Sequence, residues 1–272
     1  MQARQALPVV IKPEKIALKA SLMASGQTYG SRRLVQAMRH QGFIICRYRV
    51  RTLMKSAQLA PVWKRKFVRT TDSKHTGRIA PNLLQQDFKV FRKNKVWVAD
   101  ITYIRTQSGW LYLAAVMYLY ARKIVGWALA SHMRASLVCS ALNMAIIARQ
   151  PASGVFVHTD QGSQYASDDY CALLAKHQLM ASMSGKGNCY DNAVMERFFL
   201  NLKMERVWQT YYANHQEAIK DISHYIVAFY AQQEVPSGDS AYRLHSTLGY
   251  LSPNQFESNL TETHQNTSIK LS

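Results

Sequence analysis

The sequence predicts an α/β protein in which a mixed five-stranded sheet flanked by helices follows an N-terminal domain made of helices alone. Two observations lead to this fold class. The apolar spacing changes near residue 96 from a helical period to the apolar and β-branched runs that are typical of strands. Basic residues are concentrated before that point, so a positively charged N-terminal part precedes a neutral remainder.

The net charge of +18 belongs entirely to the first third of the chain. Residues 1–95 hold 21 Lys and Arg residues against three Asp and Glu residues, whereas residues 96–272 hold 13 of each kind. A basic part joined to a neutral part indicates a polyanion-binding region attached to a domain with a different function. Binding to RNA of the ribosomal kind, or a solvated basic tail, would give a similar distribution.

Two helices are predicted in the basic part. The first covers residues 29–38 and ends before Gly42, and the second covers residues 47–56, where basic residues surround an apolar face. A helix, a turn that contains Gly and a basic helix together are typical of a helix-turn-helix, whose second helix lies in a major groove. An ordinary amphipathic helix hairpin with a solvated basic face is the alternative.

The candidate DNA contacts are basic residues of these helices and of the segment that follows, which we expect to lie along DNA phosphates. They are Arg32, Arg33, Arg47, Arg49, Arg51, Lys55, Lys64, Arg65 and Lys66. The predicted domains are a helix-turn-helix domain over residues 1–60, a basic linker over 61–95, a core over 96–232 and a C-terminal extension over 233–272.

From residue 96 the predicted order is three strands, a helix, a strand, a helix, a strand and a helix. These elements are strands 96–104, 110–120 and 123–130, helix 135–149, strand 154–158, helix 169–177, strand 179–183 and helix 191–207. This is the order of an RNase H-like fold. Asp191 or Asn192 would cap the last helix.

Three carboxylates occur where this order of elements would bring them together. Asp100 is in the middle of the first apolar strand, Asp160 follows the fourth strand, and Glu196 lies on the last core helix. An ionised carboxylate on an apolar strand is costly unless a cation compensates it. Hard oxygen ligands suit Mg²⁺, and two such ions can assist an in-line phosphodiester displacement. A hydrogen-bonded structural Asp100 and a solvated Glu196 are the alternatives.

Three segments around these carboxylates resemble the integrase-core transposases of bacterial insertion sequences, in the large IS-three family. They are residues 97–104 (WVADITYI), 158–165 (HTDQGSQY) and 187–199 (GNCYDNAVMERFF), and the resemblance runs from Tyr29 to Phe256. It implies a D,D(35)E triad of Asp100, Asp160 and Glu196, with 35 residues between the last two.

The resemblance also implies roles for residues near the triad. Lys203, seven residues after Glu196 and so on the same helix face, is expected to contact DNA. Support of the active-site loops is expected from His158, Gly162, Asn188 and Asn192. The segment 248–253, preceded by Arg243 and His245, resembles the C-terminal signature of the family, with a structural or end-binding role.

The sequence departs from the family in two places. Tyr118 stands where family members have Asp, which is not one of the triad but puts local packing or a DNA contact in question. Residues 229–243 are longer than the corresponding link of the family and are rich in Ser and Gly. Either departure bears on whether this copy is active.

The resemblance implies a DNA transposase that cleaves and transfers strands at insertion-sequence ends with two Mg²⁺ ions, or Mn²⁺ in their place. Its partners would be double-stranded DNA, both terminal inverted repeats and target, and further copies of the chain assembled on that DNA. Fusion to, or pairing with, the product of an upstream reading frame is a further expectation. No apolar run is long enough for a membrane span, and the scattered cysteines fit reduced thiols in a cytosolic protein. The resemblance implies a bacterial, nucleoid-associated protein of the cytoplasm.

Three rival functions stay open. A DNA-binding regulator derived from a transposase would keep the fold without catalysis. An RNase H-like nuclease acting on hybrids or junctions would share the core, although the helix-turn-helix argues against it. A metal-free carboxylate hydrolase would not need the basic domain.

Overall fold

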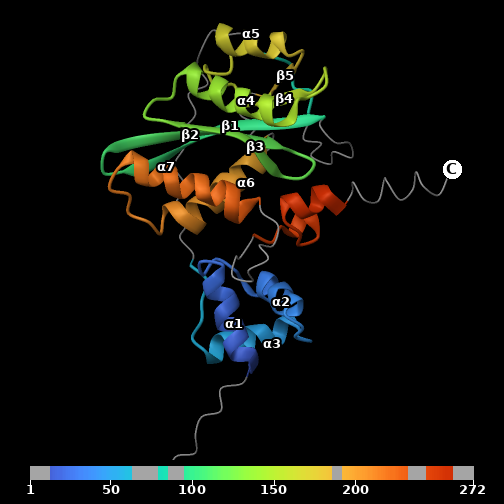
Figure 1. Cartoon of the computed structure of the whole chain (residues 1–272), viewed down its shortest axis with the longest axis vertical. Helices are drawn as coiled ribbons and strands as arrows, with labels where there is room; N and C mark the ends of the chain where they lie inside the picture. The colour runs from blue at the N-terminus through green and yellow to red at the C-terminus, as the bar shows by residue number, and fades with distance from the viewer. Residues whose placement is uncertain (1–12, 63–78, 85–94, 186–191, 232–242, 260–272) are drawn as a thin grey trace, which may run out of the picture.

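The computed structural model describes residues 13–62, 79–84, 95–185, 192–231 and 243–259. In Figure 1 the N-terminal helices form a separate lobe below a sheet that has helices on both faces. The predicted fold class is confirmed: a mixed five-stranded sheet with flanking helices follows an all-helical N-terminal part. None of the helices in these ranges has the length and apolar character that a membrane span requires.

The N-terminal lobe consists of α1 (Pro13–Ala24), α2 (Ser31–His40) and α3 (Arg47–Ser56). The two predicted helices are confirmed as α2 and α3. The preceding α1 was not predicted, although its Pro at the first position and its acidic first turn are ordinary helix-start signals. The three helices pack together because each buries an apolar stripe, with Leu18, Leu34 and Val50 fully buried at its centre.

The sheet has the strand order β3-β2-β1-β4-β5. An antiparallel meander forms one side, and two short parallel strands extend the other. The meander consists of β1 (Val96–Thr106), β2 (Gly109–Tyr118) and β3 (Lys123–Ala130), and the parallel strands are β4 (Phe156–Thr159) and β5 (Met180–Met183). All five predicted strands are confirmed.

Helices cover the two faces of the sheet in separate layers (Figure 1). One face is covered by α4 (Ala135–Arg149) and α5 (Asp168–Lys176). The other is covered by α6 (Ala193–Leu202), the π-helical turn η2 (Lys203–Val207), α7 (His215–His224) and the π-helical turn η3 (Tyr225–Tyr230). The predicted helix 191–207 therefore exists as α6 continued by η2, whereas α7 and η3 were not predicted.

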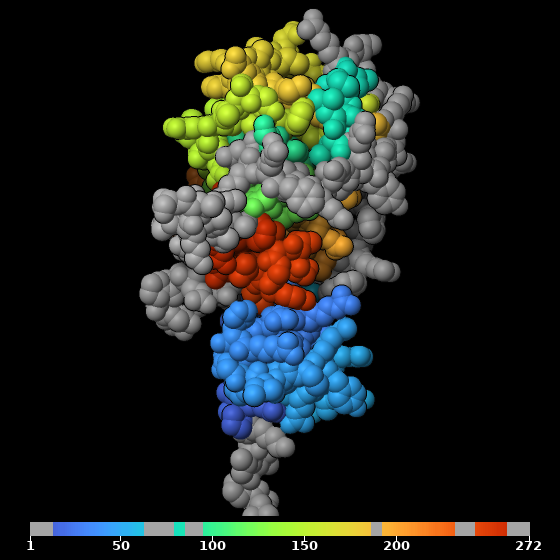
Figure 2. Space-filling view, turned by 90° about the vertical axis from the view of Figure 1, so that its right-hand side faces the viewer, coloured from blue at the N-terminus to red at the C-terminus, as the bar shows by residue number. Residues whose placement is uncertain are grey.

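The C-terminal part returns to the helices below the sheet. The short 3₁₀ helix η4 (Ser246–Leu248) is followed by helical residues 253–259. Figure 2 shows this segment, in red, directly above the blue N-terminal lobe. Most of the long link before it, residues 232–242, lies outside the described residues.

Tyr118, the first departure from the family pattern, is fully buried on the α4 side of the sheet. The guanidinium carbon of Arg149, at the end of α4, lies 4.7 Å from the centre of its ring. A cation at this distance over an aromatic face is stabilising. The tyrosine is therefore accommodated in the core and does not disrupt the packing around it.

Gly126 allows α4 to lie unusually close to β3. A Cβ atom at this position would overlap the carbonyl oxygen of Ala141 and would lie 2.6 Å from the backbone nitrogen of Ala145. Both neighbours are helix backbone, which cannot turn away as a flexible side chain can. The absence of a side chain at Gly126 is thus a condition for the contact between α4 and the sheet.

We expect Gly126→Ala to lower the free energy of unfolding by about 3 kcal/mol, because the added methyl group forces α4 away from the sheet. Urea denaturation followed by circular dichroism measures the change. Gly30→Ala is the matched control, since an added Cβ there meets nothing within 4 Å and the backbone φ is −77°. Equal stability of the two variants would contradict the close packing of α4.

A buried ion pair joins the C-terminal segment to the end of the α6–η2 helix. Arg243 donates from Nε to both carboxylate oxygens of Glu205 at 3.0 and 2.9 Å, and the two side chains are 3% and 4% exposed. The hydroxyl of Tyr225 donates to the same carboxylate at 2.6 Å. These residues, together with Arg33 of α2, whose Nη1 lies 3.5 Å from Glu205, form the Glu205 cluster.

The Glu205 cluster fastens the N-terminal lobe to the rest of the chain. Arg33 brings α2 to the carboxylate, and the hydroxyl of Tyr29 accepts a hydrogen bond of 2.9 Å from the backbone N–H of Leu244. Burial by itself would lower the pKa of Arg243, but the Glu205 carboxylate outweighs it and the pKa is raised. Arg243 therefore stays charged, and loss of Glu205 would leave this buried charge uncompensated.

Glu205→Gln is expected to destabilise the protein by about 3 to 5 kcal/mol, because it leaves the buried Arg243 charge without its carboxylate partner. The double variant Glu205→Leu with Arg243→Met should recover part of that loss, since the fully buried charge is removed and the remaining Arg33 is 24% exposed to solvent. Chemical denaturation measures both. The same substitution in an exposed pair, Glu14→Gln opposite Arg49, should cost less than about 1 kcal/mol; a similar loss at both sites would refute a special role for the cluster.

Candidate active site

Parallel pairing of β1 with β4 sets two of the predicted carboxylates beside each other. The register pairs Val98 with His158, and two residues further along each strand come Asp100 and Asp160. Neighbouring strands lie about 4.8 Å apart, and residues two apart share a face of the sheet. Asp100 and Asp160 therefore meet on one face, at the end of β4, where both side chains are half-buried.

Glu196 approaches this pair from the helix layer. It lies in the first turn of α6, which packs against β1. Its side chain is largely exposed, and partial burial raises its pKa. Glu196 thus faces solvent at the edge of the site, whereas Asp100 lies deeper.

The pKa of Asp100 reports that all three carboxylates share one electrostatic environment. Burial raises this pKa well above the usual value for Asp, and the negative charges of Asp160 and then Glu196 raise it further. A hydrogen bond of 2.7 Å from the N–H of Ile101 to Oδ1 and the charge of Lys203 act in the opposite direction. The charges of Asp160 and Glu196 therefore act on Asp100, and the nearby cationic side chain does not fully compensate their repulsion.

This donor set fits a divalent cation in its chemistry. Carboxylate oxygens are the ligands that Mg²⁺ prefers, and a cation between them would relieve the repulsion that raises the pKa of Asp100. Within the described residues, however, no three Asp, Glu, His or Cys side chains stand close enough together to hold a metal ion. The residues immediately before α6, 186–191, are outside the described ranges.

Lys203 lies at the border of the site, on the helical segment that also carries Glu196. Its Nζ lies 4.3 Å from the centre of the Tyr103 ring on β1. Burial lowers the pKa of Lys203, and the nearby Asp100 charge raises it. The ammonium group is therefore placed between an aromatic ring and the carboxylates, at the margin of the site.

His158 supports the Asp160 loop from a fully buried position at the end of β4. Its Nδ1 lies 2.9 Å from the hydroxyl of Ser182, and its Nε2 lies 3.3 Å from the hydroxyl of Ser184. The Gln161 side chain donates to the backbone carbonyl of Ser184 at 2.9 Å. With both ring nitrogens engaged in the interior, His158 fits a positioning role and not that of a proton acceptor for substrate.

Gly162 holds Asp160 in place through its backbone. Its N–H donates to Oδ1 of Asp160 at 3.0 Å, and a Cβ on Gly162 would itself lie 3.0 Å from that oxygen. Asn192 occupies the N-cap position of α6, as predicted, but its side chain makes no capping hydrogen bond. Asn188 is outside the described residues.

Sequence reasoning missed the residues that brace the site from β5 and from the linker. The Ser182 hydroxyl accepts a hydrogen bond of 2.9 Å from the N–H of Leu83, which brings the end of the linker to the sheet. Ser182 and Ser184 follow no recognisable motif, and their role depends on the pairing of β4 with β5. Only the tertiary fold could have identified them.

The predicted DNA contacts of the N-terminal lobe fall into two groups. Exposed positions on α2 and α3 are held by Arg32, Arg47, Arg51 and Lys55. Arg33 belongs to the Glu205 cluster, and Arg49 forms an ion pair of 2.7 Å with Glu14, so both are engaged within the protein. Lys64, Arg65 and Lys66 are outside the described residues.

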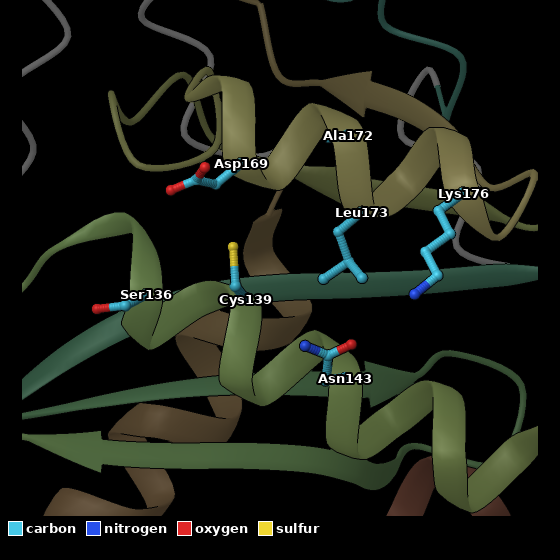
Figure 3. A pocket seen from close by; sticks show the side chains of 7 residues that line it. All are labelled: Ser136, Cys139, Asn143, Asp169, Ala172, Leu173 and Lys176. Carbon is cyan, nitrogen blue, oxygen red and sulfur yellow. The ribbon is translucent and has the colours of Figure 1, made fainter.

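A hollow between α4 and α5 lies apart from the carboxylates (Figure 3). Asp169 is the one carboxylate in its lining, which also includes Cys139 and Lys176. Burial and the Asp169 charge raise the pKa of the Cys139 thiol, which disfavours the reactive thiolate. The hollow therefore offers neither a set of metal ligands nor an activated nucleophile.

Comparison with known proteins gives two matching family models. Residues 91–189 match the model of an integrase core domain, and residues 13–67 match that of an HTH-like domain. The chain is 42% identical over 242 residues to a 31 kDa protein of insertion element IS600 from Shigella sonnei, a match that covers 89% of this chain and 86% of the relative. It is 40% identical over 238 residues to transposase InsF of insertion sequence IS3A from Escherichia coli, covering 88% and 80%.

Solved structures similar to the chain come from viral integrases. One is the intasome of simian T-cell lymphotropic virus in complex with a PP2A regulatory subunit, with a TM-score of 0.44, 15% identity, and coverage of 79% of this chain and 70% of that one. Another is the HTLV-2 integrase catalytic core in complex with magnesium, with a TM-score of 0.41, 16% identity, and coverage of 54% and 93%.

Removal of one charge from the carboxylate group should stabilise the protein when no divalent cation is present. Because folding raises the pKa of the Asp100 carboxyl, its ionisation opposes folding. The free energy of unfolding therefore falls as pH rises from the pKa of the unfolded chain through the pKa of the folded protein. Asp100→Asn should therefore raise the free energy of unfolding at pH 7, in chelator, by on the order of 1 kcal/mol. Calorimetry in EDTA measures this gain.

If Asp100 helps to hold a cation, added Mg²⁺ should raise the melting temperature of the wild type more than that of Asp100→Asn, because the variant lacks this carboxylate. Asp169→Asn on α5 removes an exposed carboxylate elsewhere and should respond to Mg²⁺ as the wild type does. An Mg²⁺ response that is the same in all three proteins would argue against a cation site at Asp100.

Proposed function

The chain belongs to the IS3 family of insertion-sequence transposases, and on that premise we propose that it cleaves and joins DNA strands at the ends of its element with Asp100, Asp160 and Glu196 as catalytic residues. The observation that carries this proposal is the meeting of Asp100 and Asp160 across β1 and β4, with Glu196 acting on the same electrostatic environment. A helix-turn-helix domain on the same chain supports DNA as the substrate.

We propose that these three carboxylates hold two Mg²⁺ ions, which Mn²⁺ can replace. When bound, such a pair of ions stabilises the charge that develops on the attacking and leaving oxygens of a phosphodiester displacement. The uncompensated repulsion at Asp100 supports this assignment, since the site as described has an excess of negative charge. Negatively charged DNA could not approach that excess without cations.

The side chains around the carboxylates have separate tasks in this proposal. Gly162 and His158 keep Asp160 at the end of β4, so its carboxylate does not have to be ordered when substrate arrives. Lys203 offers a positive charge to a phosphate at the margin of the site. Preorganised groups of this kind lower the cost of placing a phosphodiester for in-line attack.

The proposed reaction consists of two phosphodiester displacements. First, the oxygen of a water molecule bonds to phosphorus at the element end while the bond from phosphorus to the 3′ oxygen breaks, which leaves a 3′-OH on the element. That hydroxyl then bonds to a second phosphorus, and the 3′ oxygen of the other strand leaves with a proton. No bond between enzyme and DNA is needed, which fits a site built of carboxylates without a nucleophile.

We propose that residues 1–60 recognise the terminal inverted repeats, with the exposed Arg32, Arg47, Arg51 and Lys55 contacting phosphates or base edges. Because two ends and a target must be brought together, several copies of the chain would assemble on DNA, alone or with an upstream reading-frame product. We place this assembly on nucleoid DNA in the bacterial cytoplasm, in agreement with the bacterial relatives.

The test is a cleavage and strand-transfer assay on paired oligonucleotides from the ends of the element, with Mg²⁺ or Mn²⁺. Asp160→Asn is expected to reduce product by about 1,000-fold or more, because loss of a central ligand removes several kcal/mol of transition-state stabilisation. Asp169→Asn is the matched control and should retain activity. If wild type and Asp160→Asn both give no product while binding the ends equally well, the chain is instead a DNA-binding regulator derived from a transposase.

A further inference from the structure

Two cationic side chains lie on aromatic rings along the outer half of β1. Arg105 is the cross-strand partner of Trp110, and its guanidinium carbon lies 5.1 Å from the centre of the Trp110 ring. Lys203 has its ammonium nitrogen 4.3 Å from the centre of the Tyr103 ring. The two rings touch in an edge-to-face contact with 5.1 Å between their centres. Arg105, Trp110, Tyr103 and Lys203 thus form a continuous row, called here the cation–aromatic row.

The row leads from the surface to the candidate active site. Arg105 is exposed at its outer end and Trp110 is 43% exposed, whereas Lys203 at the inner end is half-buried and acts electrostatically on Asp100. Among the residues that the structure describes, neither Arg105 nor Lys203 takes part in an ion pair. Both positive charges are therefore available to an anion that comes to the protein from outside.

We propose that the cation–aromatic row binds the phosphates of one DNA strand on its way to Asp100, with Arg105 as a DNA contact that no family motif marks. The proposal rests on the proposed function, since it assumes that DNA reaches the carboxylates. Complementarity of charge favours DNA as the occupant, because an exposed Arg105 and a half-buried Lys203, neither of them in an ion pair of the described residues, border a site whose proposed substrate is a polyanion.

The rings give the cations a definite position before DNA arrives. A free Arg or Lys side chain loses rotamer freedom when it binds, whereas a guanidinium laid on an indole ring has already lost part of it. The cation–π contact is favourable even at an exposed site. It leaves the N–H groups of Arg105 free to donate to phosphate oxygens, for which the planar guanidinium is well suited.

Distance along the strand places the contact on the DNA. Arg105 lies five residues beyond Asp100 on β1, about 17 Å along the strand, and the odd spacing puts its side chain on the opposite face of the sheet. A DNA strand advances about 3.4 Å per nucleotide along the helix axis. The phosphate that Arg105 holds should therefore lie about five nucleotides or more from the bond that is cleaved, on a path that passes Tyr103 and Lys203.

The first experiment measures affinity for a fluorescein-labelled duplex that carries one end of the element, by anisotropy, over a range of salt concentrations. All proteins carry Asp160→Asn, so that binding is measured without cleavage. Arg105→Ala should weaken binding by about 5- to 10-fold and reduce the slope of log affinity against log salt by about one, the loss of one phosphate contact.

Three further variants separate charge from support. Arg105→Lys should keep the salt slope of the parent, because the charge remains. Trp110→Ala should weaken binding by about 2- to 5-fold at an unchanged slope, because only the support of Arg105 is lost. Lys176→Ala removes an exposed cation on α5, next to the hollow of Figure 3, and should change affinity and slope less than Arg105→Ala does.

The second experiment locates the contact with duplexes in which one phosphate at a time is replaced by an uncharged methylphosphonate. In a double-mutant cycle, the effect of Arg105→Ala should disappear only at one or two neighbouring linkages, about five nucleotides or more from the cleavage position. Thermal melting of each variant establishes that it is folded.

The proposal is overturned if Arg105→Ala binds with the affinity and salt slope of the parent, or if its effect is the same for every methylphosphonate position. Loss of self-association in Arg105→Ala with unaltered DNA binding would assign the row to a second copy of the chain instead. None of these binding measurements requires a reaction product. Absence of strand transfer by the wild type would therefore count against the proposed function, whereas the DNA contact of Arg105 would still be decided by the binding data.

Discussion

Parallel pairing of β1 with β4 is the constraint on which the candidate site depends. A shift of one residue in that register would turn either Asp100 or Asp160 to the opposite face of the sheet, since side chains alternate along a strand. Buried partners on both faces resist such a shift: Val98 and His158 lie on the face of the carboxylates, and Trp97 and Val157 lie on the other. Apolar packing thus holds together side chains that repel each other.

The repulsion at Asp100 has a structural cost that the rest of the core must offset. Close contact of α4 with β3 at Gly126 and the fully buried Tyr118 contribute to that core on one face of the sheet. Residues of α6 and α7 contribute on the other, where Phe198 and Ile222 are almost completely buried. The free energy of folding is a small difference between large opposing contributions, so repulsion between like charges can exceed it. Extensive apolar packing around the sheet offsets that repulsion.

The parts of the fold that were predictable are those with a local signal. Apolar runs identified the five strands, and helical spacing identified α2 and α3. The motifs named Asp100, Asp160 and Glu196 as candidates, and the pairing of β1 with β4 sets the first two beside each other. Contacts distant in sequence were not predictable: Ser182 beneath His158, Glu205 opposite Arg243, and the engagement of Arg33 within the protein all require strands and helices to be placed in space. From the sequence alone, a basic residue on a helix that contacts DNA cannot be distinguished from one that forms an ion pair within the protein.

The short π-helical turn η2 contains both Lys203, at the margin of the candidate active site, and Glu205, the centre of the Glu205 cluster. Lys203 at its start faces Tyr103 and the carboxylates, and Glu205 faces Arg33 and Arg243. A π-helical turn is wider than an α-helical one and occurs often at functional sites, because it redirects side chains without ending the helix. Glu205 is tied to the N-terminal lobe and Lys203 lies at the margin of the active site, so the five residues of η2 join the two parts of the chain by direct contacts.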